Sequence, residues 1–353
     1  MSIRKPLRLP REKSDPNVTV LMSVHNGEKY LREAVNSILN QTFDDFEFLI
    51  LNDFSTDGTA AILEGYDDPR IRIVNNEENI GLTRSLNKGL NLARGRYVAR
   101  MDADDISLPE RLEKQVIHLE THPEVALVAS IYEIINGSGE AITTCKSAMT
   151  AESIYYTSPF FCCIAHSSAM FRKDSVQALG GYDVTLRRAQ DADLWYKISR
   201  CSKVDVLNTI LVKWRQTETN ISSYHKTEQD ACAKQVFVNS LRELTNNCVE
   251  IEKISCFHDE GFPDRQPIHV NAESLLELEK IQRIMIAECP ASLRVDELKT
   301  YCDQKLQGYL CNVLLNAQLM DVVKLMRYPK FRAALLAISK RGARRVLNRN
   351  AKR

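Results

Sequence analysis

The sequence predicts an α/β protein with a mostly parallel, doubly wound sheet, followed by a helical C-terminal region. Between residue 18 and about residue 131, apolar runs of strand length alternate with stretches whose apolar residues recur at helical spacing. From about His225 onward the pattern is helical and is interrupted by prolines. Because parallel sheets bind ligands at the carboxyl ends of their strands, the loops that follow the strands are the candidate site.

Composition narrows the classes of protein. The chain has 353 residues, of which 44% are hydrophobic, enough for one large core or two domains. Its 47 basic residues nearly balance 46 acidic ones, so no nucleic-acid partner is expected. Ten cysteines without a CxxC pair or an apolar leader favour reduced thiols and a cytoplasmic location. No apolar run reaches membrane-spanning length, so any membrane contact is expected to be peripheral.

The predicted elements follow one another in strand–helix pairs. Strands are expected over 18–24, 46–51, 70–74, 97–101, 125–131, 204–207 and 211–215. Helices are expected over 28–40, 59–65, 81–93, 109–120 and 190–200. Gly95 stands where a glycine commonly ends a helix, so we expect it to close the helix that begins at Gly81.

Four segments are expected along the chain. Residues 1–16 form a flexible lead, 17–224 the α/β domain, 225–339 the helical region and 340–353 a basic tail. Helices of that region are expected over 229–244, 272–287, 295–318, 322–326 and 331–338. The tail holds seven Lys or Arg and no acid, and it follows an apolar segment. This pairing suits peripheral contact with an anionic membrane; the alternative is a soluble tail beside a packed helix.

An acidic cluster stands directly after the strand that begins at Tyr97. Asp102, Asp104 and Asp105 occupy three of four positions. Alternation along an extended chain puts Asp102 and Asp104 on the same side, where their carboxylates can share one hard cation. The alternative is structural: Asp105 or Ser107 would cap the helix that Pro109 opens.

Two further candidates lie in the second half. Asp191 and Asp193 fall in the first turn of the helix over 190–200, where acids also favour the helix dipole without any further purpose. His166 stands among apolar residues, which favours a packed, hydrogen-bonded histidine. The chain has neither GxGxxG after its first strand nor GxxxxGK[ST], so the dinucleotide and P-loop phosphate cradles are not expected.

With these motifs in view, the chain resembles glycosyltransferase family 2, the inverting nucleotide-sugar transferases with a GT-A fold. The resemblance covers residues 18–223 and rests on motifs in order. These are VTVLMSVHNGEKYLREAVNSILNQTF, LILNDFSTDGT, ENIGLTRSLNKGLNLARGRYVARMDADDISLPERLEKQ, HSSAMFRK, GGYD, QDADLWYKIS and KWRQTETNIS.

The resemblance implies a reaction and a set of residues. A sugar would pass from a nucleotide-sugar, expected to be a UDP-sugar, to an acceptor hydroxyl of a surface polysaccharide or lipid-linked glycan at the cytoplasmic face. Asp104 would be the main ligand of Mn²⁺ or Mg²⁺, with Asp102 sharing the cation or lying near the ribose, and Asp191 would be the general base. Nucleotide-sugar contacts would fall on Asp53 (base), Asp102, Arg215 (diphosphate) and His166 (sugar pocket). The alternative is a non-catalytic nucleotide-sugar-binding scaffold.

Three departures from the family pattern bear on nucleotide choice and rate. The loop commonly written Asp-Asp-Gly-Ser here runs from Asn52 through Asp53 and Phe54 to Ser55. The residue before the general base is Gln190 instead of the usual Glu, and residues 217–219 lack the usual His after the arginine.

Overall fold

The computed structural model describes residues 15–145, 149–162, 164–217, 226–254, 272–316 and 331. The chain divides into two compact units. The first unit consists of Met1–Ser158 and Cys162–Val236, and the second consists of Pro159–Phe161 and Phe237–Arg353. The domain boundary expected near residue 225 stays a prediction. The sequence predictions for residues 1–14, for helix 322–326, for the segment after Phe331 and for the basic tail lie outside the described residues.

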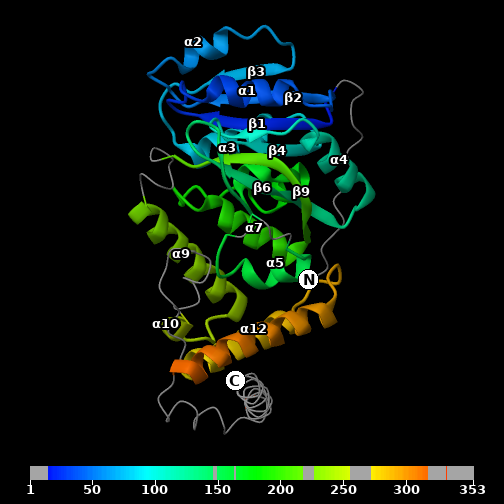
Figure 1. Ribbon diagram of the computed structural model, residues 1–353, viewed down its shortest axis with the longest axis vertical. Helices are drawn as coiled ribbons and strands as arrows, with labels where there is room; N and C mark the ends of the chain where they lie inside the picture. The colour runs from blue at the N-terminus through cyan, green and yellow to red at the C-terminus, as the bar shows by residue number, and fades with distance from the viewer. Residues whose placement is uncertain are drawn as a thin grey trace, which may run out of the picture. The chain divides into compact units, whose positions relative to one another are not determined.

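The first unit is built on one nine-stranded sheet of order β3-β2-β1-β4-β8-β6-β9-β5, with β7 paired to β6 (Figure 1). β1 pairs in parallel with β2 and β4, and β2 pairs in parallel with β3, which confirms the predicted doubly wound half. β8 runs antiparallel to β4 and β6, so the other half of the sheet is mixed. The strands are β1 (Val18–Val24), β2 (Phe46–Asn52), β3 (Ile71–Asn75), β4 (Tyr97–Met101), β5 (Ile106–Ser107), β6 (Val125–Ile135), β7 (Ala141–Thr144), β8 (Met170–Arg172) and β9 (Lys203–Arg215).

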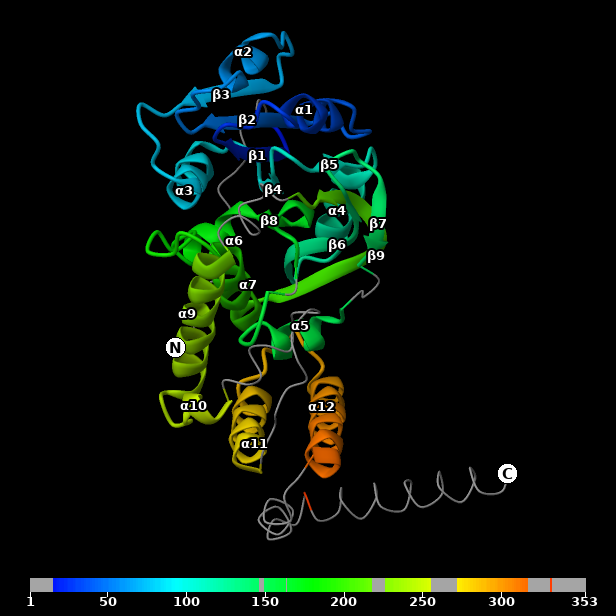
Figure 2. The ribbon, with the colours of Figure 1, turned by 60° about the vertical axis from the view of Figure 1, so that its left-hand side comes forward.

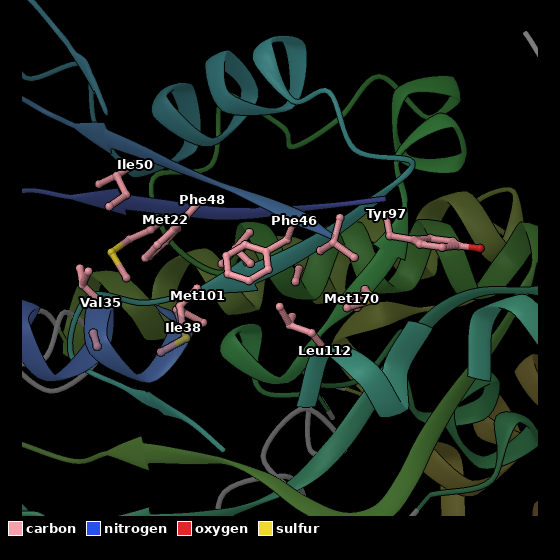
Figure 3. Close-up of a cluster of buried hydrophobic side chains, with 14 of the residues drawn as sticks. Met22, Val35, Ile38, Phe46, Phe48, Ile50, Tyr97, Met101, Leu112 and Met170 are labelled. Carbon is pink, nitrogen blue, oxygen red and sulfur yellow. The ribbon is translucent and has the colours of Figure 1, made fainter. Parts of the chain in front are cut away.

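Helices cover both faces of the sheet. Successive residues of β1 therefore point into two different cores, one on each face. Met22 packs with residues of α1 and α4, whereas Leu21 packs with residues of α3 and α7. Figure 3 shows the first core, in which Val35 and Ile38 of α1 lie against Met22 and Met101 of the sheet. The helices are α1 (Leu31–Leu39), α2 (Thr59–Glu64), α3 (Leu82–Leu92), α4 (Arg111–Thr121), α5 (Ala151–Thr157), α6 (Lys173–Ala178) and α7 (Gln190–Cys201), with a 3-10 turn at His166–Ser168.

Two details differ from the sequence prediction. The segments 204–207 and 211–215 belong to one strand, β9, because its pairing with β6 shifts register at residues 208–209 and the chain stays extended there. Gly95 does not end α3, which closes at Leu92. A Cβ on Gly95 would lie 2.3 Å from the backbone nitrogen of Thr19, so this position needs glycine for its close approach to β1.

The second unit is helical, as the sequence predicts. It contains α10 (Ile251–Ile254), α11 (Ala272–Ala287) and α12 (Val295–Asn316), and α9 (Lys226–Thr245) spans the boundary between the units. Helices α11 and α12 are neighbours (Figure 2), and the side-chain amide of Gln282 donates to the backbone oxygen of Cys302 at 3.1 Å. Within the described ranges, no helix is both long enough and apolar enough to cross a membrane.

Candidate active site

The acid loop, Asp102 to Asp105, stands at the carboxyl end of β4. Asp102 is held on both carboxylate oxygens, by the guanidinium of Arg100 on one and by the hydroxyl of Ser167 at 2.8 Å on the other. Burial alone would raise the pKa of Asp102, but the charge of Arg100 and these hydrogen bonds bring it below its usual range. Asp102 is therefore an ionised, fixed carboxylate.

The other two acids of the loop differ from Asp102 and from each other. Asp105 is 1% exposed and accepts the backbone N–H of Arg215 at 2.8 Å. Burial, and next the charge of Asp104, raise the pKa of Asp105 well above its usual range. Burial, and next the charge of Asp102, raise the pKa of Asp104 to about 7. Asp105 is thus a structural residue, whereas the ionised form of Asp104 is disfavoured by burial and by the charge of Asp102 despite the nearby charges of Arg100 and Arg215.

The helix-capping alternative for this loop is wrong. Helix α4 begins at Arg111 after Glu110, well beyond the acid loop. Asp105 is bound to β9, and the hydroxyl of Ser107 accepts the side-chain amide of Gln41 at 3.1 Å. Both side chains therefore join the loop to other elements, and neither binds the start of α4.

Buried arginines lie beneath the acid loop, and sequence reasoning missed them. Arg100 and Arg111 are both 0% exposed. Arg111 donates to the backbone oxygens of Arg100 at 2.7 Å and Ala169 at 3.2 Å. A signal was present: Arg100 interrupts the apolar strand two residues before Asp102, at a position where an unpaired charge would be costly. Such an arginine requires an acidic partner close by.

The donor set of this loop fits a divalent cation. Across the residues that the structure describes, no group of three or more His, Cys, Asp or Glu side chains is arranged to hold a metal. Asp102 and Asp104 offer oxygen ligands, and a cation would offset the repulsion between them, which adds to burial in raising the pKa of Asp104. The two carboxylates would hold the cation, while water and ligand oxygens complete its coordination.

Asp53 directly follows β2 and is 2% exposed. One carboxylate oxygen accepts the side-chain amide of Asn76 at 2.8 Å and the N–H of Ile80 at 3.0 Å. The other oxygen accepts the N–H of Gly81 at 2.9 Å, at the start of α3. Asp53 therefore fixes the α3 terminus at the carboxyl edge of the sheet, and its contact with a nucleotide base stays a prediction.

Phe54 follows Asp53 with a backbone φ of +58°, and its side chain is 50% exposed. A left-handed conformation costs a non-glycine residue about 1–2 kcal/mol, and such outliers gather at functional sites. The family's usual glycine at this position would adopt this conformation without strain. Phe54 therefore keeps a strained backbone to hold an exposed ring beside the predicted base contact.

We expect Phe54→Gly to stabilise the protein by up to about 1 kcal/mol, since relief of the left-handed strain exceeds the entropic cost of glycine. Phe54→Ala is the matched control, because it removes the ring but keeps the strain. Urea unfolding of the two variants measures the difference. Equal stability of both variants would contradict the strain, and equal loss of nucleotide affinity in both would assign the ring to binding.

Asp191 lies in the first turn of α7. Ala189, which precedes the helix, has a left-handed backbone with a φ of +55°. Burial raises the pKa of Asp191, and the charge of Asp102 raises it further, so the two carboxylates lie close enough to interact. The thiol of Cys162 is 3.7 Å from Asp191 Oδ2. Asp193 instead pairs with Lys197 at 2.7 Å and is the structural acid of this turn.

His166 packs between aromatic rings on the same side of the site. Its Nε2 is 2.9 Å from the hydroxyl of Tyr182, and its ring lies edge-on to Trp195 with centroids 5.8 Å apart. Burial, and next the charge of Arg100, lower the pKa of His166 to about 3. His166 is thus a neutral, hydrogen-bonded side chain near Asp102, and its contact with a sugar stays a prediction.

Arg215, the predicted diphosphate contact, lies below the acid loop with a side chain that is 1% exposed. Its Nε donates to the backbone oxygen of Asp104 at 2.8 Å, and its Nη2 donates to Glu33. The structure therefore brings Arg215 to the site through the backbone of the acid loop. Together, carboxylates whose chemistry suits a cation and a buried carboxylate of raised pKa can support nucleophilic transfer away from an anionic leaving group.

Solved structures share this fold. TarS of S. aureus in complex with UDP-GlcNAc has a TM-score of 0.55 at 18% identity, over 82% of this chain and 90% of that one. A mannosyltransferase of Pyrobaculum calidifontis, in complex with GDP-Man and Mn²⁺, has a TM-score of 0.52 at 16% identity, over 95% of this chain and 90% of that one. The protein therefore has the GT-A fold of nucleotide-sugar glycosyltransferases.

Sequence relatives give the family. Residues 19–180 match the profile described as Glycosyl transferase family 2. An uncharacterized glycosyltransferase of Methanocaldococcus jannaschii is 36% identical over 58% of this chain and 72% of its own length. The O-antigen biosynthesis glycosyltransferase WbnJ of Escherichia coli is 32% identical over 68% of this chain and 94% of its own length. The chain belongs to glycosyl transferase family 2.

Proposed function

We propose that this glycosyltransferase is inverting and metal-dependent, and that it moves a sugar from a UDP-sugar to an acceptor hydroxyl. The observation that carries the proposal is that Asp191 lies near enough to the acid loop for the charge of Asp102 to add to burial in raising its pKa. When a hydroxyl displaces a diphosphate, a general base must take the proton of the hydroxyl and a cation can offset the charge of the diphosphate, so both sites are needed at the same edge of the sheet. The TarS and P. calidifontis complexes, with nucleotide-sugars and in one case Mn²⁺, support the donor class.

Each side chain then has one task. Asp191 takes the proton of the acceptor hydroxyl as its oxygen attacks the anomeric carbon from the face opposite the diphosphate. Asp104, with Asp102 beside it, would hold Mn²⁺ or Mg²⁺, which offsets the charge that develops on the departing nucleoside diphosphate. Asp53 accepts an N–H of the base, and His166 borders the sugar as a neutral side chain.

For the acceptor, we propose a surface polysaccharide or a lipid-linked glycan. The name of WbnJ, an O-antigen biosynthesis glycosyltransferase at 32% identity, supports this class. We also propose that the reaction takes place in the cytoplasm at the inner face of the membrane, with the basic tail over 340–353 as the peripheral contact.

A ligand screen tests the donor. We expect a UDP-sugar with Mn²⁺ to raise the melting temperature most, since ligand at one hundred times its dissociation constant stabilises by about 2.7 kcal/mol. GDP-sugars and metal-free samples are the controls. A larger shift with GDP-sugars would overturn the choice of uridine. Release of nucleoside diphosphate from the bound donor would exclude the non-catalytic scaffold.

A further inference from the structure

Arg215 contacts two neighbouring residues of the acid loop. Its Nε donates to the carbonyl oxygen of Asp104 at 2.8 Å, and its own backbone N–H donates to Asp105 Oδ1 at 2.8 Å. Both bonds run from the last residue of β9 to neighbouring residues of the loop. One residue therefore binds both the backbone carbonyl of Asp104 and the side chain of the residue that follows it.

The same guanidinium reaches two more segments. Its Nη1 donates to the backbone oxygens of Asn136 at 3.3 Å and Gly137 at 3.2 Å, between β6 and β7. Its Nη2 pairs with Glu33 of α1, and its central carbon lies 4.5 Å from the centre of the Tyr30 ring. One side chain thus joins α1, the acid loop and the β6–β7 loop.

These contacts leave Arg215 poorly placed to bind phosphate. A guanidinium holds phosphate by turning two N–H groups toward its oxygens. Here all three nitrogens of Arg215 donate to oxygens of the protein, and the side chain is 1% exposed. Contact with a diphosphate would break bonds that hold the acid loop in place.

We propose that Arg215 is a positioning residue: it fixes the backbone of the acid loop so that Asp104 presents its carboxylate to the cation, and Glu33 orients it for that task. This inference rests on the proposed metal-dependent function. Lysine cannot replace Arg215, because a single ammonium cannot donate in three directions in one plane.

The test is a Mn²⁺ titration of the full chain, followed by electron paramagnetic resonance, without nucleotide and with UDP. We expect Arg215→Lys to raise the Mn²⁺ dissociation constant about tenfold, the scale for loss of a charge-assisted hydrogen bond. Glu33→Gln should shift it in the same direction by less. The double variant should add little to Arg215→Lys, since both act through one contact.

Arg172→Lys is the matched control. Arg172 also donates to backbone oxygens, those of Val125 at 2.8 Å and Leu119 at 2.6 Å, and it is paired with Tyr97 at the opposite end of β4. Its loss should lower the free energy of unfolding and leave Mn²⁺ affinity unchanged. An equal loss of Mn²⁺ affinity in this control would reduce Arg215 to general stability and overturn the proposal.

The remaining outcomes separate the inference from the proposed function. If Arg215→Lys binds Mn²⁺ as the wild type does but loses affinity for UDP at saturating Mn²⁺, Arg215 is a phosphate ligand and the inference is wrong. If the wild type binds no Mn²⁺ with or without UDP, the metal dependence itself fails. Should Arg215→Lys not fold by circular dichroism, Glu33→Gln decides alone, because the Glu33 side chain is 52% exposed and its loss spares the core.

Discussion

Asp191→Asn is expected to slow glycosyl transfer by about 10²–10⁴-fold, the usual cost of removing a general base, while donor and metal binding stay close to wild type. The amide keeps the shape of the carboxylate but cannot accept the proton of the acceptor hydroxyl. Transfer rates, with calorimetric titration of UDP and Mn²⁺, measure both halves of the prediction. A variant that lost donor binding as severely as turnover would make Asp191 a donor-side residue.

The pH profile gives a second readout of Asp191. Because burial and the charge of Asp102 raise the pKa of Asp191, the ionised base is lost as pH falls through that raised value. The acidic limb of kcat/KM should therefore lie above the usual range of aspartate. Asp193→Asn is the control on the same helical turn. It loses the ion pair with Lys197, but its transfer rate and the acidic limb of its pH profile should match those of the wild type.

Asp104→Ala is expected to abolish transfer and to weaken binding of the nucleoside diphosphate, because it removes the main protein ligand proposed for the cation. Asp102→Ala should affect binding less. Turnover and calorimetric titration of UDP, each measured over a range of Mn²⁺ concentrations, check both variants. Full activity of Asp104→Ala at ordinary Mn²⁺ concentrations would remove Asp104 from the metal site.

Stability distinguishes this loss of function from misfolding. The pKa of Asp104 is raised to about 7 in the folded protein. The folded state therefore loses stability as the pH rises from the ordinary pKa of aspartate toward 7, because the carboxyl ionises more readily in the unfolded chain. The metal-free Asp104→Ala variant should therefore unfold at no lower a temperature than wild type at pH 8. A clear drop in its melting temperature would show instead that Asp104 supports the fold.

Much of the sheet could be predicted because its strands are buried on both sides. All seven residues of β1 are buried and five of them are apolar, so the limits of the strand are visible in the sequence. The three-residue strand β8 was missed because it is short and lies between a 3-10 turn and α6. Its antiparallel pairing with β4 depends on contacts between residues far apart in sequence.

For the site, the sequence located the acids by their position at the ends of predicted elements. It did not reveal the partner of Asp102 that is distant in sequence, because Ser167 meets Asp102 only once β4 and the 3-10 turn are adjacent. The role of Asp105 was likewise hidden, since its partner Arg215 is 110 residues away. Motif spacing therefore identifies candidate ligands, and the structure is needed to distinguish the acids that bind other parts of the protein from those that can bind a ligand.

The buried arginines beneath the acid loop bear on any attempt to redesign this enzyme. The loop's three acids are held by Arg100, which binds Asp102, and by Arg215, which binds Asp104 and Asp105. Copying Asp102 to Asp105 into another scaffold would therefore transfer like charges without their support, and the graft would be expected to ionise incompletely. Changes meant to alter donor preference belong at exposed positions such as Phe54, whose side chain does not hold the acid loop.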